Sequence, residues 1–309
     1  MNTVKQTLPG GVFAANLTPQ HPDLRVDAEK LLTHCRWLLT HGCNGLAVMG
    51  TTGEANSFSV KERMEILDAL LQGGISPGVF MLGTGCSALT DSVELTRHAL
   101  EHGVSNVLML PPFYYKNISD DGVFRSIAEV IERVGNAQMQ IYLYHFPNMS
   151  AVPFSVEVVQ RLLDRYPHII AGMKDSSGDW KHIKSMCEEF PGFRLYAGTE
   201  KYLLDALEVG GVGCISATTN VTCGLAAKVF DAWQARDLDR AHELQAYLTT
   251  IRVTFEHYPF IPGLKSYLAH ITDQDHWLAM RPPFLPLSDE KLSVLLEALR
   301  SHNFTLEYA

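Results

Sequence analysis

The sequence predicts an α/β fold, a closed (β/α)8 TIM barrel with a small C-terminal helical appendage. Eight short apolar runs alternate with longer amphipathic stretches over residues 11–218, which is the order of a parallel sheet with crossover helices. The runs are apolar at nearly every position, as expected of strands that are covered on both faces. An open doubly wound sheet is the alternative, but no Gly-x-Gly-x-x-Gly segment follows the first run.

The strands are expected at the eight apolar runs. In chain order these are residues 11–18, 45–50, 79–85, 106–112, 140–146, 169–174, 193–198 and 213–218.

Three stretches between the expected strands have helical periodicity and clear ends. They are residues 27–42, 59–73 and 90–103. The second begins at Ser59, a candidate N-cap, with Glu62 at the capping-box position. The three stretches stop at Gly42, Gly73 and Gly103, as helices commonly do.

After the eighth strand, the sequence predicts further helices outside the barrel. They are expected at residues 238–256, 263–270 and 289–300. The proline-rich segment before the last one gives it an N-cap at Ser288 or Asp289. We therefore expect a barrel domain at residues 1–235 and a helical extension, residues 236–309, that packs on it.

Composition excludes several classes of protein. The net charge of the 309 residues is −9 and no Lys/Arg-rich stripe occurs, so a nucleic-acid partner is not expected. The N-terminus does not resemble a signal peptide, and no run of about 18 apolar residues predicts a membrane span, so we expect a cytoplasmic protein. The six cysteines are scattered without zinc-binding spacing, and no metal site is predicted.

Polar side chains gather at the C-terminal ends of the expected strands, where TIM barrels carry their chemistry. In chain order they are Thr51, Thr52 and Glu54; Tyr114, Tyr115 and Lys116; Tyr144 and His145; Lys174 and Asp175; the segment "AGTE"; and Ser216. A lysine and several tyrosines are therefore expected to meet at one mouth of the barrel.

Lys174 is the residue for which this setting predicts a reaction. Burial in a mostly apolar barrel disfavours the charged amine and lowers its pKa, so the neutral amine can attack the keto carbon of a 2-oxo acid. The resulting imine withdraws electrons from the neighbouring carbon, and a nearby phenol can move the protons. The alternative is a surface lysine that pairs with Asp175. Structural readings also stay open for "GTTGE" as a tight turn, for "FYY" as packing at a subunit contact, and for His145 and Glu54.

Four motifs together resemble the dihydrodipicolinate synthase / N-acetylneuraminate lyase family. They are "GTTGE", "PPFYYK", "YHFP" and "GMKDSSGD", in this order and at these spacings. The resemblance extends over nearly the whole chain, from "GVFAANLTP" through "GCISATTNV" to "IPGLKSYL". Members of this family are Schiff-base aldolases that handle pyruvate on a (β/α)8 barrel, so the resemblance implies a lyase that needs no cofactor beyond the lysine imine.

The resemblance also implies roles for individual residues. Lys174 matches the lysine that forms the imine, and Tyr144 matches the tyrosine that acts as general acid and base above it. Thr51 and Thr52 match the pair that holds the carboxylate of the 2-oxo acid, and Thr51 also joins a proton relay with Tyr144.

Further positions of the site are implied in the same way. Gly50, Gly198 and Ile215 match backbone positions that line the substrate pocket. Tyr114 resembles the tyrosine that is offered across a tight dimer contact to a neighbouring site, with Tyr115 as the next candidate. The family implies a homo-oligomer in which two such dimers form a tetramer.

One departure from the family pattern bears on the substrate. Dihydrodipicolinate synthases carry an arginine shortly after the tyrosine motif, and this chain has Met149 at that place and His145 in place of an asparagine. Met149 cannot pair with the carboxylate of aspartate semialdehyde. We therefore expect pyruvate, with an aldehyde or sugar acid, in cleavage, condensation or dehydration of 2-keto-3-deoxy acids or 4-hydroxy-2-oxoglutarate-like acids. One alternative is an authentic dihydrodipicolinate synthase in which Lys116 replaces the arginine. Another is a non-catalytic 2-oxo acid sensor.

Overall fold

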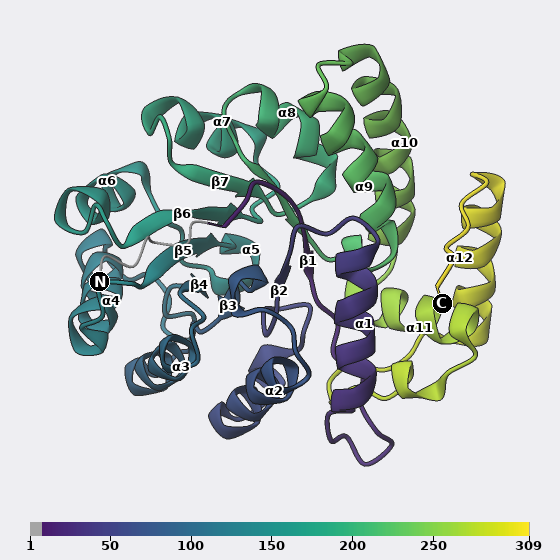
Figure 1. Ribbon diagram of the computed structural model, residues 1–309, viewed down its shortest axis with the longest axis horizontal. Coiled ribbons are helices and arrows are strands. Elements are labelled where there is room, and N and C mark those ends of the chain that lie inside the picture. The colour runs from purple at the N-terminus through teal and green to yellow at the C-terminus, as the bar shows by residue number, and fades with distance from the viewer. Residues whose placement is uncertain (1–7, 309) are drawn as a thin grey trace.

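Eight parallel strands form the wall of a barrel in the computed structural model, which describes residues 8–308 (Figure 1). They are β1 (Gly11–Ala15), β2 (Gly45–Ala47), β3 (Leu82–Gly83), β4 (Asn106–Met109), β5 (Gln140–His145), β6 (Ile170–Asp175), β7 (Arg194–Ala197) and β8 (Gly213–Ser216). Pairing follows the order β2-β1-β8-β7-β6-β5-β4-β3. Each strand lies within or beside the run in which it is expected, so the eight-strand prediction is confirmed.

The ring closes between β2 and β3 through two backbone hydrogen bonds. The N–H of Met81 donates to Leu46 O at 2.9 Å, and the N–H of Gly83 donates to Val48 O at 2.8 Å. The expected strand 79–85 is short in the structure because a 3-10 turn, η2 (Pro77–Val79), occupies its start. The predicted (β/α)8 barrel is confirmed, and the open doubly wound alternative is wrong.

Helices surround the strands as an outer layer, apart from the four-residue helix α5 (Pro147–Ser150), which lies at the end of β5 inside the ring of outer helices (Figure 1). The outer helices are α1 (Ala28–Thr40), α2 (Val60–Gln72), α3 (Leu89–Glu101), α4 (Asp120–Val134), α6 (Val156–Arg165), α7 (Trp180–Glu189), α8 (Leu203–Glu208) and α9 (Thr219–Gln234). Helix α2 has the predicted capping box, in which the N–H of Glu62 donates to Ser59 Oγ and the N–H of Ser59 donates to Glu62 Oε2. Such a cap is worth about 1 kcal/mol and sets where the helix begins.

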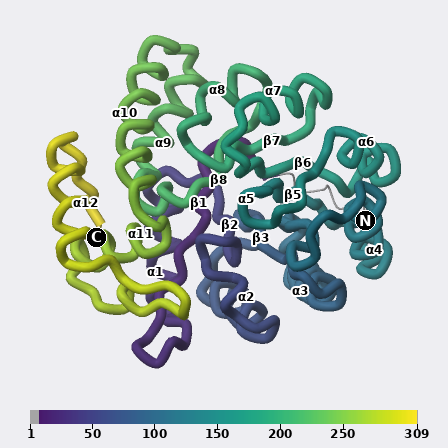
Figure 2. Tube along the Cα trace, turned by 180° about the vertical axis from the view of Figure 1, so that it is seen from behind, coloured from purple at the N-terminus to yellow at the C-terminus, as the bar shows by residue number. Residues whose placement is uncertain are grey.

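Three further helices lie beside α9 and α1 (Figures 1 and 2). They are α10 (Leu238–Glu256), α11 (Phe260–Thr272) and α12 (Asp289–Ser301). Helix α11 starts three residues before its expected start, because Pro262 lies in the first turn, where its missing N–H costs no hydrogen bond. Ser288 is the N-cap of α12 and accepts from the N–H of Lys291, so Ser288 and not Asp289 caps this helix.

The extension shares a core with the barrel. Leu17 and Val221, from the barrel part of the chain, pack in one buried cluster with Phe255, Leu264 and Trp277 from the C-terminal part. The expected boundary after residue 235 falls between α9 and α10. The division of the chain into two domains stays a prediction.

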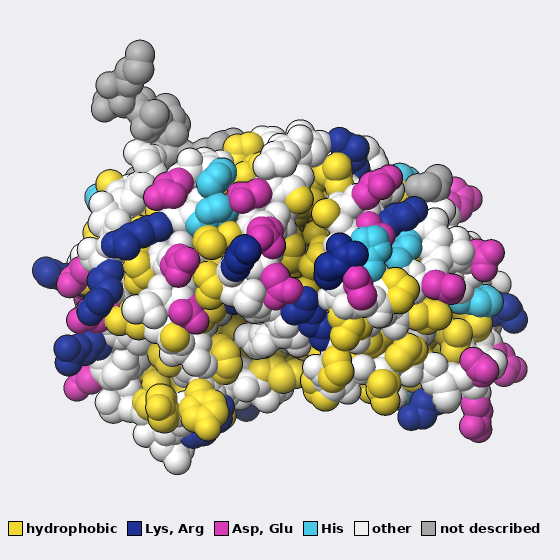
Figure 3. All heavy atoms as spheres, turned by 90° about the horizontal axis from the view of Figure 1, so that it is seen from below, with side chains coloured by type: hydrophobic (Ala, Val, Ile, Leu, Met, Phe, Trp, Pro, Cys, Tyr) yellow, Lys and Arg dark blue, Asp and Glu magenta, His cyan; other side chains and the backbone are white. Residues whose placement is uncertain are grey.

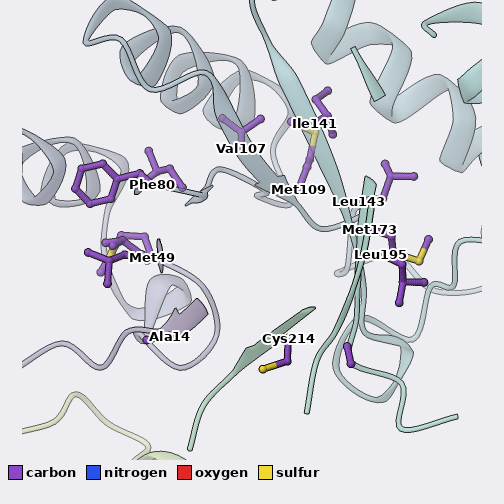
Figure 4. Packing of buried hydrophobic residues seen from close by; sticks show 14 of the residues in the cluster. Ala14, Met49, Phe80, Val107, Met109, Ile141, Leu143, Met173, Leu195 and Cys214 are labelled. Atoms are coloured by element: carbon purple, nitrogen blue, oxygen red, sulfur yellow. The ribbon is translucent and has the colours of Figure 1, made fainter. Parts of the chain in front are cut away.

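Side chains of successive strand residues alternate between the inside of the barrel and the helix layer. In β5, Tyr142 and Tyr144 belong to the inner cluster, and Ile141 and Leu143 belong to the outer one. Figure 4 shows this outer layer, with Met173 among the side chains that cover the strands. This period of two decides which residues of β5 and β6 face a site inside the barrel.

The surface has charges of both signs. Figure 3 shows Lys and Arg side chains interspersed with Asp and Glu over the face in view, without the extended basic surface that phosphate binding requires. Of the helices formed by residues 8–308, none is both long and apolar enough to cross a membrane.

Candidate active site

Strand pairing brings Lys174 and Tyr144 together inside the barrel. β5 and β6 are in a register that pairs Tyr144 with Lys174, and both side chains face inward. The Lys174 amine donates to the Tyr144 hydroxyl at 3.4 Å, and its nitrogen lies 4.4 Å from the centroid of the Tyr144 ring. Lys174 is 4% exposed and Tyr144 is 3% exposed. The alternative of a surface lysine is therefore wrong.

Thr51 extends this pair to a chain of three polar groups. It follows β2, and its hydroxyl lies 3.3 Å from the Tyr144 hydroxyl. The loop that carries Thr51 turns sharply, with left-handed backbone at Met49 (φ 56°) and Glu54 (φ 60°). Thr51, from the loop after β2, thus joins Tyr144 of β5 and Lys174 of β6 in a continuous path along which protons can move.

Glu54 anchors the loop that carries Thr51. Its carboxylate accepts from Lys265 Nζ at 2.8 Å, from Gln20 Nε2 at 3.1 Å and from the N–H of Arg281 at 3.1 Å. The side chains of Glu54 and Lys265 are fully buried. Burial lowers the pKa of Lys265, and the neighbouring Glu54 carboxylate opposes that shift. These contacts support a structural role for Glu54 over a catalytic one.

A small hollow lies beside Tyr144 and Thr51. Its solvent-accessible volume is about 10 Å³, well below that of ligand sites. It is lined by Met49, Gly50, Thr51, Ala55, Asn56, Gly83, Gly85, Leu108, Leu110 and Tyr144. Larger hollows lie elsewhere on the surface, among them one of about 250 Å³ between α3 and α4. The convergence of polar groups therefore marks this site better than its size does.

Three other predicted site residues, Ile215, Thr52 and Gly198, lie at or near the ends of the strands around this chain of polar groups. Ile215 belongs to the same inner cluster as Tyr144, and Thr52 is buried in the loop after Thr51. Gly198 lies between the ends of β6 and β7, where a Cβ would approach the Asp175 carbonyl oxygen to 2.6 Å. A side chain at residue 198 would therefore push these two strands apart.

Tyr114 lies apart from the buried group. It is 73% exposed, and its ring packs against Tyr115 with centroids 5.4 Å apart. Within residues 8–308 of one chain, no hydrogen bond joins Tyr114 to Thr51 or Tyr144. A role of Tyr114 in a neighbouring subunit's site stays a prediction.

A second polar cluster lies on the outer side of the same two strands. His182 Nδ1 lies 2.5 Å from Asp175 Oδ2, and His182 Nε2 donates to Phe154 O at 3.3 Å. The ring of His182 stacks on His145 at 4.0 Å and 9°. His145 Nδ1 in turn accepts from the N–H of Phe154 at 3.1 Å. The outer cluster, defined as His145, Asp175 and His182, thus fixes the ends of β5 and β6 from the helix layer.

The charges of this outer cluster follow from its contacts. Burial lowers the pKa of His145 to about 4, so the ring is neutral. Burial acts against the charge on Asp175, but the hydrogen bond from His182, electrostatic interaction with the two histidines and the hydrogen bond from Ser177 together outweigh it and lower the pKa of Asp175. Burial also acts against the charge on His182, but the hydrogen bond to Asp175, the negative charge of that carboxylate and the contact with Phe154 O together raise the pKa of the imidazole. A period of two in the strands places residues 145 and 175 outside, but nothing in the sequence indicated His182.

Comparison with known proteins identifies the family of this chain. Residues 8–302 match the model of the Dihydrodipicolinate synthetase family. The chain belongs to this family. A DapA-like lyase of Chloroflexus aurantiacus, described as uncharacterized, is 36% identical over 94% of this chain and 96% of its own length. A 4-hydroxy-tetrahydrodipicolinate synthase of Methanopyrus kandleri is 31% identical over 76% of this chain and 77% of its own.

Solved structures agree with this dihydrodipicolinate synthetase family assignment. Dihydrodipicolinate synthase from Agrobacterium tumefaciens has a TM-score of 0.83 and 31% identity, over 94% of this chain and 98% of that one. The family protein YagE from E. coli K12, in complex with pyruvate, has a TM-score of 0.88 at 23% identity, over 97% and 100% of the two chains. The family consists of lyases and aldolases, so this chain is an enzyme of that kind.

The position of the family's missing arginine is open to solvent. Met149 lies in the short helix α5 and is 64% exposed. Lys116, the suggested substitute, donates instead to the carbonyl oxygens of Phe113 and of Ser150. Lys116 therefore ties its own loop to the end of α5.

The polar ends of β7 and β8 form a network of their own. The Glu200 carboxylate accepts from Ser216, Thr218 and Thr222, and Arg252 Nη1 lies 3.4 Å from it. Ser216 and Glu200 were expected at the mouth beside Lys174. The structure joins them to α10 of the extension instead, because Arg252 supplies the charge that buried Glu200 requires.

Proposed function

We propose that Lys174 forms an imine with pyruvate or with the 2-oxo acid portion of a longer acid. The observation that supports this most directly is the buried amine 3.4 Å from the hydroxyl of Tyr144. The amine adds to the keto carbon, the adduct loses water, and the nitrogen then carries the positive charge. The charged nitrogen can accept the electron pair of a C–H or C–C bond at the neighbouring carbon, so that carbon can lose a proton or its bond to the aldehyde portion can break.

Tyr144 is proposed to carry the protons of these steps. Its hydroxyl lies between the Lys174 amine and the Thr51 hydroxyl, within reach of both. A phenol that gives a proton to the departing water, or to the aldehyde oxygen in condensation, must recover it before the next turnover. In cleavage it takes a proton from the substrate hydroxyl and must pass it on. Thr51 supplies such a path, and general acid–base catalysis of this kind contributes typically 10²–10⁴-fold in rate.

The substrate carboxylate is proposed to lie at the "GTTGE" loop. Gly50 and Thr51 line the hollow beside Tyr144, and Thr52 is the next residue of the loop. Gly198 and Ile215 are proposed to border the same space from β7 and β8. Tyr114 is proposed to reach the site of a partner chain, since its side chain is exposed in one chain. A dimer, with two dimers in a tetramer, would satisfy this arrangement.

The reaction is proposed to be aldol cleavage or condensation, or dehydration, of a 2-keto-3-deoxy acid or a 4-hydroxy-2-oxoglutarate-like acid. Met149 supports this class over aspartate semialdehyde, because a thioether offers no charge to a second carboxylate. Similar structures include a 2-keto-3-deoxygluconate aldolase of Sulfolobus solfataricus and a sialic acid aldolase of Ruminococcus gnavus, at 21% and 19% identity. At that identity they support the fold alone.

Borohydride reduction in the presence of pyruvate tests the imine. We expect one pyruvate adduct per chain, found by mass spectrometry on the peptide with Lys174 and absent from Lys174→Ala. The exposed Lys181, on α7, gives a matched control, since Lys181→Ala should keep the adduct. An adduct on Lys265, the second buried lysine, would overturn the proposal.

A substrate panel separates the proposed reaction from its rivals. It contains 2-keto-3-deoxy acids, 4-hydroxy-2-oxoglutarate, N-acetylneuraminate, and pyruvate with aspartate semialdehyde. Turnover of the sugar acids that Lys174→Ala abolishes supports the proposal. Faster turnover of aspartate semialdehyde would favour a dihydrodipicolinate synthase, and pyruvate binding without any turnover would favour a sensor.

A further inference from the structure

We infer that Asp68, His98 and His102 form a binding site for a divalent cation of the zinc class between α2 and α3. His98 lies on α3 and His102, four residues later, is the C-cap residue of that helix, so their side chains lie on the same side of the helix end. Asp68, on the neighbouring helix α2, faces both of them. Two imidazoles and a carboxylate are ligands that Zn²⁺ and its neighbours in the first transition row accept.

The spacing of the three ligand atoms fits one ion. Asp68 Oδ1 lies 2.8 Å from His98 Nε2 and 3.6 Å from His102 Nε2. All three ligand atoms lie within 4.8 Å of one another. In a tetrahedral site with bonds of about 2.0–2.2 Å, ligand atoms are about 3.3 Å apart. The two distances to Asp68 lie on either side of this value, and the two histidine nitrogens lie within 4.8 Å of each other, so side-chain movement without backbone rearrangement would complete the site.

A hydrogen bond already holds His102 in the orientation that a ligand needs. Its Nδ1–H donates to the carbonyl oxygen of His98 at 2.8 Å, which leaves the Nε2 lone pair free and directed at Asp68. Ligating histidines almost always donate their other ring N–H in this way. His98 Nε2 donates to Asp68 without an ion, and a bound ion would take the place of that proton.

Two helix ends add a favourable field at this place. Asp68 lies one turn before the end of α2, His98 lies in the last turn of α3, and His102 follows α3 directly. The C-terminal ends of helices carry partial negative charge, which stabilises a cation. All three side chains are partly exposed, so an ion can enter from solution.

The outer cluster beside the active site offers the same residue types, but most of its ligand atoms already have buried hydrogen-bond partners. Both ring nitrogens of His182 bond to Asp175 and to Phe154 O, and His145 Nδ1 accepts from the Phe154 N–H. A metal there would have to break these buried bonds. The site between α2 and α3 therefore carries the inference.

A bound ion would join the ends of two neighbouring barrel helices. These ends lie away from the mouth that holds Lys174, on the side where TIM barrels depend on residues for stability instead of catalysis. The site would correct the expectation that no residue of this chain binds a metal, and it requires no metal in the reaction. The spacing His98-x3-His102 is visible in the sequence, but its partner Asp68 comes from another helix.

Zn²⁺ titration of the tag-free, chelator-treated chain tests the inference. Isothermal titration calorimetry is expected to give one ion per chain, and the ion should raise the midpoint of thermal unfolding. His98→Gln, His102→Gln and Asp68→Asn should each weaken Zn²⁺ binding at least about tenfold, because each removes one protein ligand. His242→Gln is the matched control, since His242 is an exposed histidine that pairs with one carboxylate, Glu208.

Three outcomes would overturn the site. They are no saturable binding near one ion per chain, Zn²⁺ affinity that His98→Gln and His102→Gln leave unchanged, and an equal loss of affinity in His242→Gln. Circular dichroism confirms that each variant is folded, and His102, at the exposed end of α3, gives the variant least open to misfolding. Failure of this test leaves the proposal for Lys174 untouched, because borohydride trapping measures imine formation at Lys174 and not Zn²⁺ binding between α2 and α3.

Discussion

Lys174 and Asp175 are neighbours in β6, and their side chains lie on opposite sides of the barrel wall. Lys174 reaches Tyr144 in the interior, whereas Asp175 binds His182 in the helix layer. The paired strand repeats the relationship, because Tyr144 faces inward and His145 faces outward. The outer cluster therefore fixes the same strand ends that hold the amine and the phenol.

Replacing His145 should change how stability depends on pH. The pKa of His145 is about 4 in the folded chain, below the ordinary value of 6.5. Between these values the unfolded chain binds a proton at this residue and the folded chain does not. This residue alone therefore lowers the free energy of unfolding as the pH falls, by about 2 kcal/mol between pH 6.5 and 5.

His145→Asn should remove this contribution, because the Asn Oδ1 can accept from the N–H of Phe154 without titrating. Urea unfolding at pH 6.5 and 5 measures the difference between wild type and variant. His182 acts in the opposite direction, since its raised pKa adds stability at low pH that is lost as the pH rises. His182 is present in both proteins, so the comparison removes most of that contribution. An equal change in the free energy of unfolding between pH 6.5 and 5 for wild type and His145→Asn would contradict the prediction.

Removing the Tyr144 hydroxyl should slow the reaction without abolishing the imine. Tyr144→Phe keeps the ring over Lys174 and removes the proton carrier, so we expect kcat to fall about 10²–10⁴-fold. Thr51→Val should have a smaller effect, because water can replace a relay hydroxyl. Steady-state kinetics and borohydride trapping measure the two properties separately. Unchanged kcat in Tyr144→Phe would exclude this residue as the acid and base.

Breaking the buried pair of Glu54 and Lys265 should destabilise the whole chain. Lys265→Met leaves the Glu54 carboxylate buried without its cation, and such a loss costs about 3–5 kcal/mol. The double variant Lys265→Met/Glu54→Gln should recover part of that loss, because no uncompensated charge remains. Urea unfolding measures all three proteins. A double variant less stable than Lys265→Met would show that the charge is not the cause.

Introducing a cation at residue 149 should change the choice of substrate. Met149→Arg provides a partner for a second carboxylate, and a hydrogen bond to a charged group is worth about 1.5–3 kcal/mol, or roughly 10–100-fold in kcat/KM. We expect turnover of aspartate semialdehyde to rise relative to the sugar acids. Met149→Gln is the uncharged control. Residue 149 is exposed, so neither substitution should disturb folding. Equal substrate ratios in both variants would contradict the prediction.

The sequence predicted the features that depend on local patterns. Eight apolar runs gave the strands, and the ends of those strands gave Thr51, Tyr144 and Lys174 before any distance was known. Ser59 and Ser288 began their helices as cap chemistry predicts. The uncertain elements were those with a short or interrupted pattern, such as β3 and the start of α11.

The partners of the site could not be predicted, because they come from distant parts of the chain. His182 reaches Asp175 from a helix whose rotation a sequence does not show. Lys265 is 211 positions from Glu54, and Arg252 reaches Glu200 from α10. Buried charges predict that a partner exists, but only the packing of helices on the barrel shows which residue it is.

The contact between Lys265 and Glu54 has a consequence for how the protein can be divided. The Lys265 amine also donates to Thr18 O and Ala279 O, so it joins the first strand's loop, the second strand's loop and the tail. A fragment that ends at residue 235 would lack Lys265, so the Glu54 carboxylate would be buried without a positively charged partner. Barrel and tail are therefore expected to melt in a single transition, and neither half should survive as an independently produced piece.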